Sequence, residues 1–306
     1  MQNLYMSLKK DLIAGLSKKN KIIPSKYHYD YQGSKYFEKI TQQKEYYPTR
    51  KEKEILKKIS KKLPKMFNGS LSFCEIGSGA TDKIKILMNK KVKFYFPIDI
   101  SAKFIRIASK KLKIKYPNLR IKPVIADYNK PFKIKNFKKT TKVFFFLGSS
   151  IGNFHPGEDV KFLKNLSKCI DKKSFIFIGV DLVKKASIIT KAYNDKAGYT
   201  AKFSLNLINI INRNFNCGLN INDFSYVGIY NKSLKSLQGF LVSKSNQSFK
   251  IGSKKFNLRK GEKIQVEVSN KFTPKSFISI AKKANFKTHS YWTDKQNYFA
   301  LFLLKR

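Results

Sequence analysis

The chain has few of the residues that build metal centres and disulfide frameworks. Its 306 residues include three cysteines, three histidines and no Cys-x-x-Cys pair. The cysteines are dispersed and odd in number, which is typical of a reducing compartment and argues against a disulfide-stapled fold. The histidines lie far apart in the sequence, without metal-ligand spacing. We therefore predict neither disulfides nor a metal site.

Long apolar runs are also missing. A membrane-spanning helix needs roughly 18–20 consecutive apolar residues, and the sequence contains no such run. Near the N-terminus, the apolar run Leu12–Leu16 is shorter than a signal-peptide core. These absences predict a cytoplasmic protein that does not associate with a membrane.

Acidic residues are scarce. The chain has 19 Asp and Glu against 64 Lys and Arg, a formal net charge of +45 at pH 7. Such a field attracts nucleic acid without sequence specificity. The lysines are spread evenly, and Asn, Ile, Phe and Tyr are abundant with them, which is typical of an A/T-rich coding bias. Two interpretations stay open, coding bias alone and an enzyme that binds RNA.

One stretch, Leu71–Asp99, has the pattern strand, glycine turn, helix, strand. Leu71–Ile76 and Lys93–Ile98 are apolar strands, and Gly77-Ser78-Gly79 forms a turn whose backbone N–H groups can approach a ligand. Asp99 follows about 20 residues past the glycines, where a carboxylate can hold ribose hydroxyls. The helix between them is expected to have Thr81 as its N-cap and a buried face made of Ile84, Ile86, Leu87 and Met88.

The glycine turn favours S-adenosylmethionine (SAM) over a dinucleotide. A dinucleotide fingerprint needs a third glycine where this chain has Asp82. A carboxylate there would repel a pyrophosphate, whereas SAM carries a sulfonium cation and no phosphate. The alternative is an ordinary tight turn followed by a helix-capping aspartate.

Alternating strands and helices continue along the chain and predict an α/β fold. Arg120–Ala126 is expected to form a strand that ends at Asp127-Tyr128, an acidic-aromatic pair suited to an adenine. Lys142–Leu147 is almost entirely apolar, as a buried parallel strand should be, and it leads into the turn 148–154. The pattern changes near Val183, and we infer an insertion over roughly 184–270. A helix is expected next over Thr273–Ala284, with Thr273 as its N-cap and Pro274 in its first turn. Two final strands then form the antiparallel edge typical of a methyltransferase sheet.

The N-terminal segment Ser25–Arg50 is dense in tyrosine. Crowded aromatic side chains pack into a core or lid, or line a pocket for a small amine or ring, and the residues alone leave both interpretations open. A basic helix is expected over Lys51–Leu63, with Pro64 as its stop signal.

Ten blocks in order along nearly the whole chain resemble the SAM-dependent histidine Nα-methyltransferases, which make hercynine for ergothioneine synthesis. The blocks are YDYQGSKYFEKITQQKEYYPTR, CEIGSGATDK, PIDIS, ADY, FLGSSIGNFHP, GVDLVK, AYNDKAGYTAKFSLNLI, INR, VEVSNKF and YWTD. The resemblance implies a Rossmann-like SAM methyltransferase core of residues 52–183 and 271–306. It also implies a second, α+β substrate-binding domain of residues 1–51 and 184–270.

The resemblance also implies the site residues. Those for SAM are Gly77, Lys83, Asp99, Asp127 and Tyr128; those for L-histidine are Tyr46, Asn153, Tyr193, Glu267 and Ser269. Tyr29 is expected near the substrate amine, where it and Tyr46 orient the substrate without acting as acid, base or nucleophile. Apart from the resemblance, Tyr193 reads as a core aromatic, Asn153 as a turn residue and Glu267 as a solvated strand residue.

One departure from the family pattern bears on specificity. Gly239 stands where the family usually has a methionine beside the substrate ring, and it is expected to widen the pocket. Another amino acid or an aromatic amine is therefore an alternative substrate. A nucleic-acid methyltransferase is a weaker alternative, because the chain has no Asn/Asp-Pro-Pro-aromatic loop. The family analogy implies a monomer.

Overall fold

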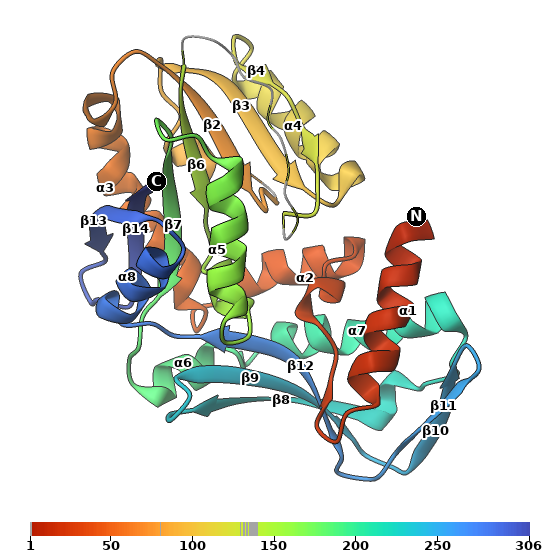
Figure 1. The fold of residues 1–306 in the computed structure, drawn as a ribbon. Coiled ribbons are helices and arrows are strands. Elements are labelled where there is room, and N and C mark those ends of the chain that lie inside the picture. The colour runs from red at the N-terminus through yellow and green to blue at the C-terminus, as the bar shows by residue number, and fades with distance from the viewer. Residues whose placement is uncertain (1, 80, 129, 131, 133, 135–139) are drawn as a thin grey trace. The chain divides into compact units, whose positions relative to one another are not determined.

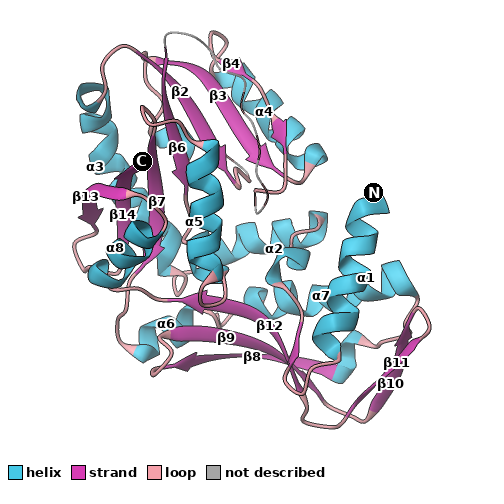
Figure 2. Cartoon of the chain, viewed as in Figure 1, coloured by secondary structure: helices cyan, strands magenta, loops and turns pink. Residues whose placement is uncertain are grey.

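The computed structural model describes residues 2–79, 81–128, 130, 132, 134 and 140–306. The chain divides into two compact units. Unit 1 comprises Met1–Tyr47 and Lys184–Asn270, and unit 2 comprises Pro48–Val183 and Lys271–Arg306. Figure 1 labels the elements of both units, and Figure 2 shows that each contains helices as well as strands.

Unit 2 is built on a sheet whose strand order is β13-β14-β7-β6-β2-β3-β4, with β5 also pairing β3. The strands are β2 (Ser70–Ile76), β3 (Val92–Asp99), β4 (Arg120–Ile121), β5 (Val124–Ile125), β6 (Thr140–Phe146), β7 (Phe175–Asp181), β13 (Lys287–Thr293) and β14 (Phe299–Lys305). β14 pairs antiparallel with both of its neighbours, β13 and β7, whereas the other pairs of these strands are parallel. This is the predicted Rossmann-like order with its antiparallel edge. The direction of winding reverses between β2 and β6, which is where open α/β sheets bind ligands.

Helices cover both faces of this sheet. On one face, α5 (Glu158–Cys169) and α8 (Pro274–Lys283) pack on alternate residues of the central strands. On the other face, α3 (Tyr47–Met66) and α4 (Ala102–Lys115) pack on the intervening residues. Because both faces are covered, the central strands are apolar at successive positions. The run Phe144-Phe145-Phe146 is fully buried for this reason.

The predicted helix after the glycine turn is wrong. The segment has only a single 3-10 turn, Ile84–Ile86, although Ile84 and Leu87 are buried against the sheet as expected. Thr81 has a φ of +62° and a buried hydroxyl without a hydrogen-bond partner among the described residues, so it does not cap a helix. Asn89 binds the backbone of Leu87 and Lys91 through its side-chain amide. This local turn competes with a helix and ends the segment early.

Two other predictions about single elements are wrong because of proline. Arg120–Ala126 is not one strand but two short ones, β4 and β5, which flank Pro123. Proline has no N–H for the ladder, so the strand breaks there. Pro64 does not end its helix: α3 includes Pro64 and continues to Met66. Lys91 donates to the carbonyl oxygens of Pro64 and Phe67, at 2.7 and 2.9 Å, which satisfies acceptors at the helix end.

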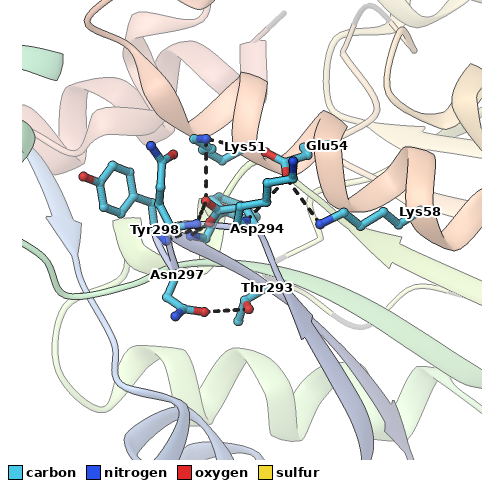
Figure 3. A network of polar contacts seen from close by, with 10 residues as sticks. Lys51, Glu54, Lys58, Thr293, Asp294, Asn297 and Tyr298 are labelled. Atoms are coloured by element: carbon cyan, nitrogen blue, oxygen red, sulfur yellow. Dashed lines mark hydrogen bonds and ion pairs between the residues drawn. The ribbon is translucent and has the colours of Figure 1, made fainter.

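The turn between β13 and β14 is held by a buried carboxylate. Asp294 is 2% exposed and accepts backbone N–H groups from Gln296, Tyr298 and Phe299 at 2.7–3.0 Å. Lys51 of α3 lies 3.7 Å from the same carboxylate. Figure 3 shows Lys51 and Tyr298 beside Asp294 at this turn. The YWTD block is therefore explained by a structural role, the closing of this hairpin.

Unit 1 is an α+β unit with a mixed four-stranded sheet, ordered β1-β12-β9-β8. The strands are β1 (Lys21–Ile22), β8 (Phe224–Asn231), β9 (Ser236–Ser243) and β12 (Lys263–Asn270), and β10 (Gln247–Ile251) and β11 (Lys254–Leu258) form a separate hairpin. The helices are α1 (Gln2–Leu16), α2 (Tyr31–Gln42), α6 (Ala186–Ala192) and α7 (Tyr199–Phe215). Apolar side chains of α1, α7, the sheet and the hairpin form its core.

Candidate functional site

The glycine turn lies at the carboxyl end of β2, beside the point where the sheet reverses. Gly77 and Gly79 have φ values of +64° and +48°, a region that L side chains rarely adopt. The Gly77 N–H donates to the Ile98 carbonyl at 2.8 Å, and the Gly79 N–H lies 3.4 Å from the Asp99 carboxylate. The turn is thus tied to the end of β3 and presents bare backbone to a ligand.

Asp99 ends β3 with its carboxylate against this turn. It accepts the Ser101 N–H at 3.0 Å in addition to the contact with Gly79. Burial raises the pKa of Asp99, and the backbone N–H groups oppose that rise. A partly buried carboxylate that is fixed by backbone donors is suited to accept hydrogen bonds from ribose hydroxyls.

Tyr128 follows β5 and lies beside the glycine turn. Its ring edge is 3.7 Å from the position that a Cβ on Gly77 would occupy. Phe146 and Phe162 hold the ring by edge-to-face contacts, with centroids 5.7 and 6.0 Å away. Burial raises the pKa of Tyr128 to about 12, so the phenol stays neutral. Asp127 precedes it and is partly buried, so the acidic-aromatic pair lies at the strand end as the sequence indicates.

Lys83 is held by a residue that the sequence analysis did not single out. Its ammonium lies 2.6 Å from the carboxylate of Glu52, which is fully buried on α3. The other Glu52 oxygen accepts the backbone N–H of Gly148 at 2.8 Å. Glu52 therefore connects the segment after β2 to the loop after β6. It lies two residues past the YYPTR block, a position that gave no signal of its own.

Glu75, at the end of β2, is a second buried carboxyl group near this point. Tyr95 on β3 donates a hydrogen bond to it. Burial raises the pKa of Glu75 to about 8, with Lys83 acting in the opposite direction. Glu75 is therefore largely protonated at neutral pH.

The loop after β6 contains Asn153 at the end of a 3-10 turn, Ser150–Asn153. Ser149 begins the turn with a φ of +62°, and its hydroxyl accepts the Asp181 N–H at 2.8 Å. Asp181 in turn forms a buried ion pair with Lys271 at 2.8 Å. Asn153 is partly buried. It is the one predicted histidine contact that belongs to unit 2.

The other predicted histidine contacts gather within unit 1. The hydroxyls of Tyr193, which follows α6, and Ser269 on β12 form a buried hydrogen bond of 2.7 Å. The ring of Tyr46 meets that of Tyr193 edge to face, with centroids 6.0 Å apart. Glu267 is two residues before Ser269 on β12, so the two side chains share a face of the sheet. Four of the predicted residues are thus brought together.

Tyr29 lies further along the same aromatic series. Its ring contacts Phe37 at 5.6 Å, and Phe37 contacts Tyr46 at 6.2 Å. Tyr29 is 44% exposed. The rings of the tyrosine-dense segment therefore pack on one another, which is one of the two uses that its sequence left open.

Asp30 anchors this segment to α7. Its carboxylate caps α2 through the Gly33 N–H at 2.7 Å, accepts from Asn206 at 2.9 Å and pairs with Arg213 at 2.6 Å. Two separate blocks of the resemblance, YDYQG and INR, thus meet in one ion pair. Asp30 and Arg213 are 183 positions apart, so no local sequence pattern indicates that they form an ion pair.

The expectation that Gly239 widens the pocket is wrong. Gly239 on β9 pairs with Glu267 on β12 and with Gly228 on β8. A Cβ on Gly239 would lie 2.9 Å from the Glu267 Cβ and 3.0 Å from the Tyr226 hydroxyl. The ring of Tyr226 fills the space that the glycine leaves. The sequence does not point to Tyr226, because the register between β8 and β9 decides whether its ring lies over Gly239.

The described residues contain no group of three or more His, Cys, Asp and Glu that could hold a metal ion. None of their helices combines the length and the apolar character needed to span a bilayer.

Comparison with known proteins gives the family. A family described as histidine-specific, SAM-dependent methyltransferase matches residues 8–306. The histidine N-alpha-methyltransferase of Mycolicibacterium smegmatis is 30% identical over 308 residues, which cover 98% of this chain and 95% of that protein. The histidine N-alpha-methyltransferase of Mycobacterium tuberculosis is 29% identical, with the same two coverages. A solved SAM-dependent methyltransferase from Clostridium acetobutylicum is 11% identical with a TM-score of 0.45, covering 99% of this chain and 98% of that one. The chain belongs to the histidine-specific, SAM-dependent methyltransferase family.

Proposed function

We propose that this chain transfers methyl groups from SAM to the α-amino nitrogen of L-histidine and gives Nα,Nα,Nα-trimethylhistidine. The family match over residues 8–306 carries this proposal. Ser269, which shares a sheet face with Glu267 and is hydrogen-bonded to Tyr193, supports it, because an imidazole needs both a donor and an acceptor.

In this proposal unit 2 holds the methyl donor. Gly77 presents backbone to the donor, Asp99 accepts from the ribose, and Asp127 and Tyr128 hold the adenine. Lys83 pairs with the methionyl carboxylate. The Lys83 ammonium has three N–H donors, and Glu52, whose carboxylate is 2.6 Å away, accepts from one of them. The other donors can bind a second carboxylate.

The amino acid would be held chiefly by unit 1. Glu267 and Ser269 bind the two ring nitrogens, and the hydroxyls of Tyr46 and Tyr193 bind the carboxylate, together with Asn153 of unit 2. Tyr29 lies near the amine in this scheme. Methyl transfer is an in-line displacement, in which the amine lone pair forms the new N–C bond as the S–C bond breaks. Such a reaction depends on alignment rather than on a protein nucleophile.

Calorimetry of the purified full chain tests this function. S-adenosylhomocysteine should bind first, L-histidine should then bind to that complex, and mass spectrometry with SAM should detect trimethylhistidine. Glu267→Ala should weaken histidine binding by at least about tenfold, because a hydrogen bond to a charged group is lost, while binding of S-adenosylhomocysteine changes little. Glu262→Ala, which removes a carboxylate just before the same strand, is the control. Absence of histidine binding to the wild-type complex would refute the function, and equal losses for both ligands would refute the role of Glu267.

We further propose that the enzyme is a cytoplasmic monomer that attracts nucleic acid only non-specifically. The three free cysteines support a reducing compartment, and the net charge of +45 supports the attraction to nucleic acid. The family analogy supports the monomer. Light scattering of the eluting protein tests the monomer. Titration with unrelated RNA sequences tests the attraction, which should show no sequence preference and should fall steeply with salt.

A further inference from the structure

The side chain of Tyr226, on β8, extends over the neighbouring strand β9 in the sheet of unit 1. On β8, Tyr226 and Gly228 share a face, and Gly228 pairs with Gly239 on β9. A Cβ on Gly228 would lie 3.2 Å from the Tyr226 hydroxyl, and one on Gly239 would lie 3.0 Å from it. The phenol ring therefore runs over two paired glycines. A larger side chain at either position would displace it.

The end of this ring reaches the residues proposed to hold the substrate. Gly239 pairs directly with Glu267, whose Cβ is 2.9 Å from the same Cβ position on Gly239. The Cβ position on Gly228, 3.2 Å from the Tyr226 hydroxyl, is also 3.3 Å from the backbone oxygen of Tyr193, so the hydroxyl is close to both Glu267 and Tyr193. Burial raises the pKa of Tyr226, and Glu267 and Tyr193 raise it further. The hydroxyl thus lies beside Glu267 and Tyr193, the second of which is hydrogen-bonded to Ser269.

The Tyr226 hydroxyl has unused hydrogen-bonding capacity. Although the residue as a whole is partly buried, its oxygen is enclosed, and it has no hydrogen bond of acceptable geometry among the described residues. The Ser204 hydroxyl on α7 is the neighbour that can pair with it. A phenol hydroxyl has one donor and two acceptor sites, so capacity for a further partner is left. Buried polar groups are normally paired, so an enclosed hydroxyl beside a binding cluster is suited to bind a polar ligand atom.

We propose that Tyr226 is a specificity-determining residue, which closes the substrate-ring site over Gly239 and offers its hydroxyl to the ring of the bound amino acid. This inference rests on the proposed function. The ring of Tyr226 takes the place of the side chain that Gly239 lacks and limits the size of the substrate ring. The hydroxyl favours a ring with a polar atom at that end, such as imidazole, over a hydrocarbon ring.

Three variants separate the two roles. Tyr226→Phe removes only the hydroxyl and should weaken histidine binding about tenfold, the usual effect of one lost hydrogen bond, while tryptophan is still excluded. Tyr226→Ala removes the ring as well, and the preference for histidine over tryptophan should fall by at least about tenfold. Tyr226→Ala with Gly239→Met should exclude tryptophan again without recovering full histidine affinity. Ile229→Ala, a truncation at an exposed position on the same strand, is the control.

Binding should be measured by calorimetry with S-adenosylhomocysteine present, and the KM values for histidine and SAM should be compared. A change confined to the amino acid supports the inference, and an equal change in the KM for SAM contradicts it. Unchanged histidine affinity in Tyr226→Phe would overturn it, as would continued exclusion of tryptophan by a folded Tyr226→Ala. If Tyr226→Ala does not fold, Tyr226→Phe decides alone. A wild-type complex that does not bind histidine would instead refute the proposed function.

Discussion

The fold of unit 1 encloses the imidazole of His28 in an environment that opposes its protonation. The side chain is 1% exposed, and its ring stacks on Phe203 with centroids 4.8 Å apart. Nδ1 lies 2.9 Å from the carbonyl oxygen of Ser25, so Nδ1 carries the proton and donates it. Nε2 is buried without a partner among the described residues. Burial lowers the pKa of His28 from 6.5 to about 4, and the bond to Ser25 only partly opposes this.

This depressed pKa makes stability depend on pH in a definite direction. The folded chain keeps His28 neutral, whereas the unfolded chain binds a proton below pH 6.5. The contribution to the free energy of unfolding is therefore complete above pH 6.5 and is lost as the pH falls towards 4. Between pH 7.5 and pH 5, we expect His28 to lower that free energy by about 2 kcal/mol.

The variant His28→Phe isolates this effect, because phenylalanine keeps a ring for the stack on Phe203 and cannot be protonated. Urea titrations followed by circular dichroism should be run on both chains at pH 7.5 and pH 5. Other titrating groups are common to both chains and cancel in the difference. The stability of His28→Phe relative to wild type should rise by about 2 kcal/mol at the lower pH. His289→Phe, the same substitution at an exposed position, is the matched control. The reasoning is refuted if the free energy of unfolding of His28→Phe differs from that of wild type by the same amount at both pH values.

Two further predictions concern unit 2. A Cβ on Gly179 would lie 2.3 Å from a carboxylate oxygen of Glu52 and 3.1 Å from the ring of Phe299, so Gly179→Ala should lower stability by about 1–3 kcal/mol. It should also weaken binding of S-adenosylhomocysteine in calorimetry, because Glu52 is displaced from Lys83; unchanged binding would contradict that link. Asp294→Ala removes the acceptor of three backbone N–H groups and should cost about 3–5 kcal/mol in urea titrations. Asp294→Asn keeps one acceptor oxygen and should cost less, and equal costs would contradict the turn-closing role.

The parts of the fold that the sequence predicts well are those with short-range causes. The strands at Leu71–Ile76 and Lys142–Leu147 are found as β2 and β6, because continuous apolar runs have to be buried on both faces. The helix α8 begins at Pro274 with Thr273 as its cap, since proline at the first turn and a hydroxyl before it favour a helix start. The failures also have local causes, namely the proline at position 123 and the side-chain turn at Asn89.

The candidate donor site follows the sequence closely because its residues lie at the ends of consecutive strands. Gly77 and Asp99 are only 22 positions apart, and a parallel β-α-β arrangement brings such strand ends to one edge of the sheet. Lys83 shows where this reasoning stops. The sequence shows that Lys83 follows the glycine turn. Its ion-pair partner, Glu52, lies on α3, a helix that precedes β2 in the chain, and no sequence pattern links the two.

The sequence by itself determined the α/β core, the glycine turn and the order of the family's blocks, because each depends on residues that are neighbours in the chain. Only the tertiary structure decided how Tyr226 fills the space over Gly239, how Asp30 meets Arg213, and how Glu52 holds Lys83. Each of these contacts depends on strand register or helix packing across long stretches of chain. Side-chain identity alone does not determine which distant groups are brought together, since that is settled only when the whole apolar core is buried.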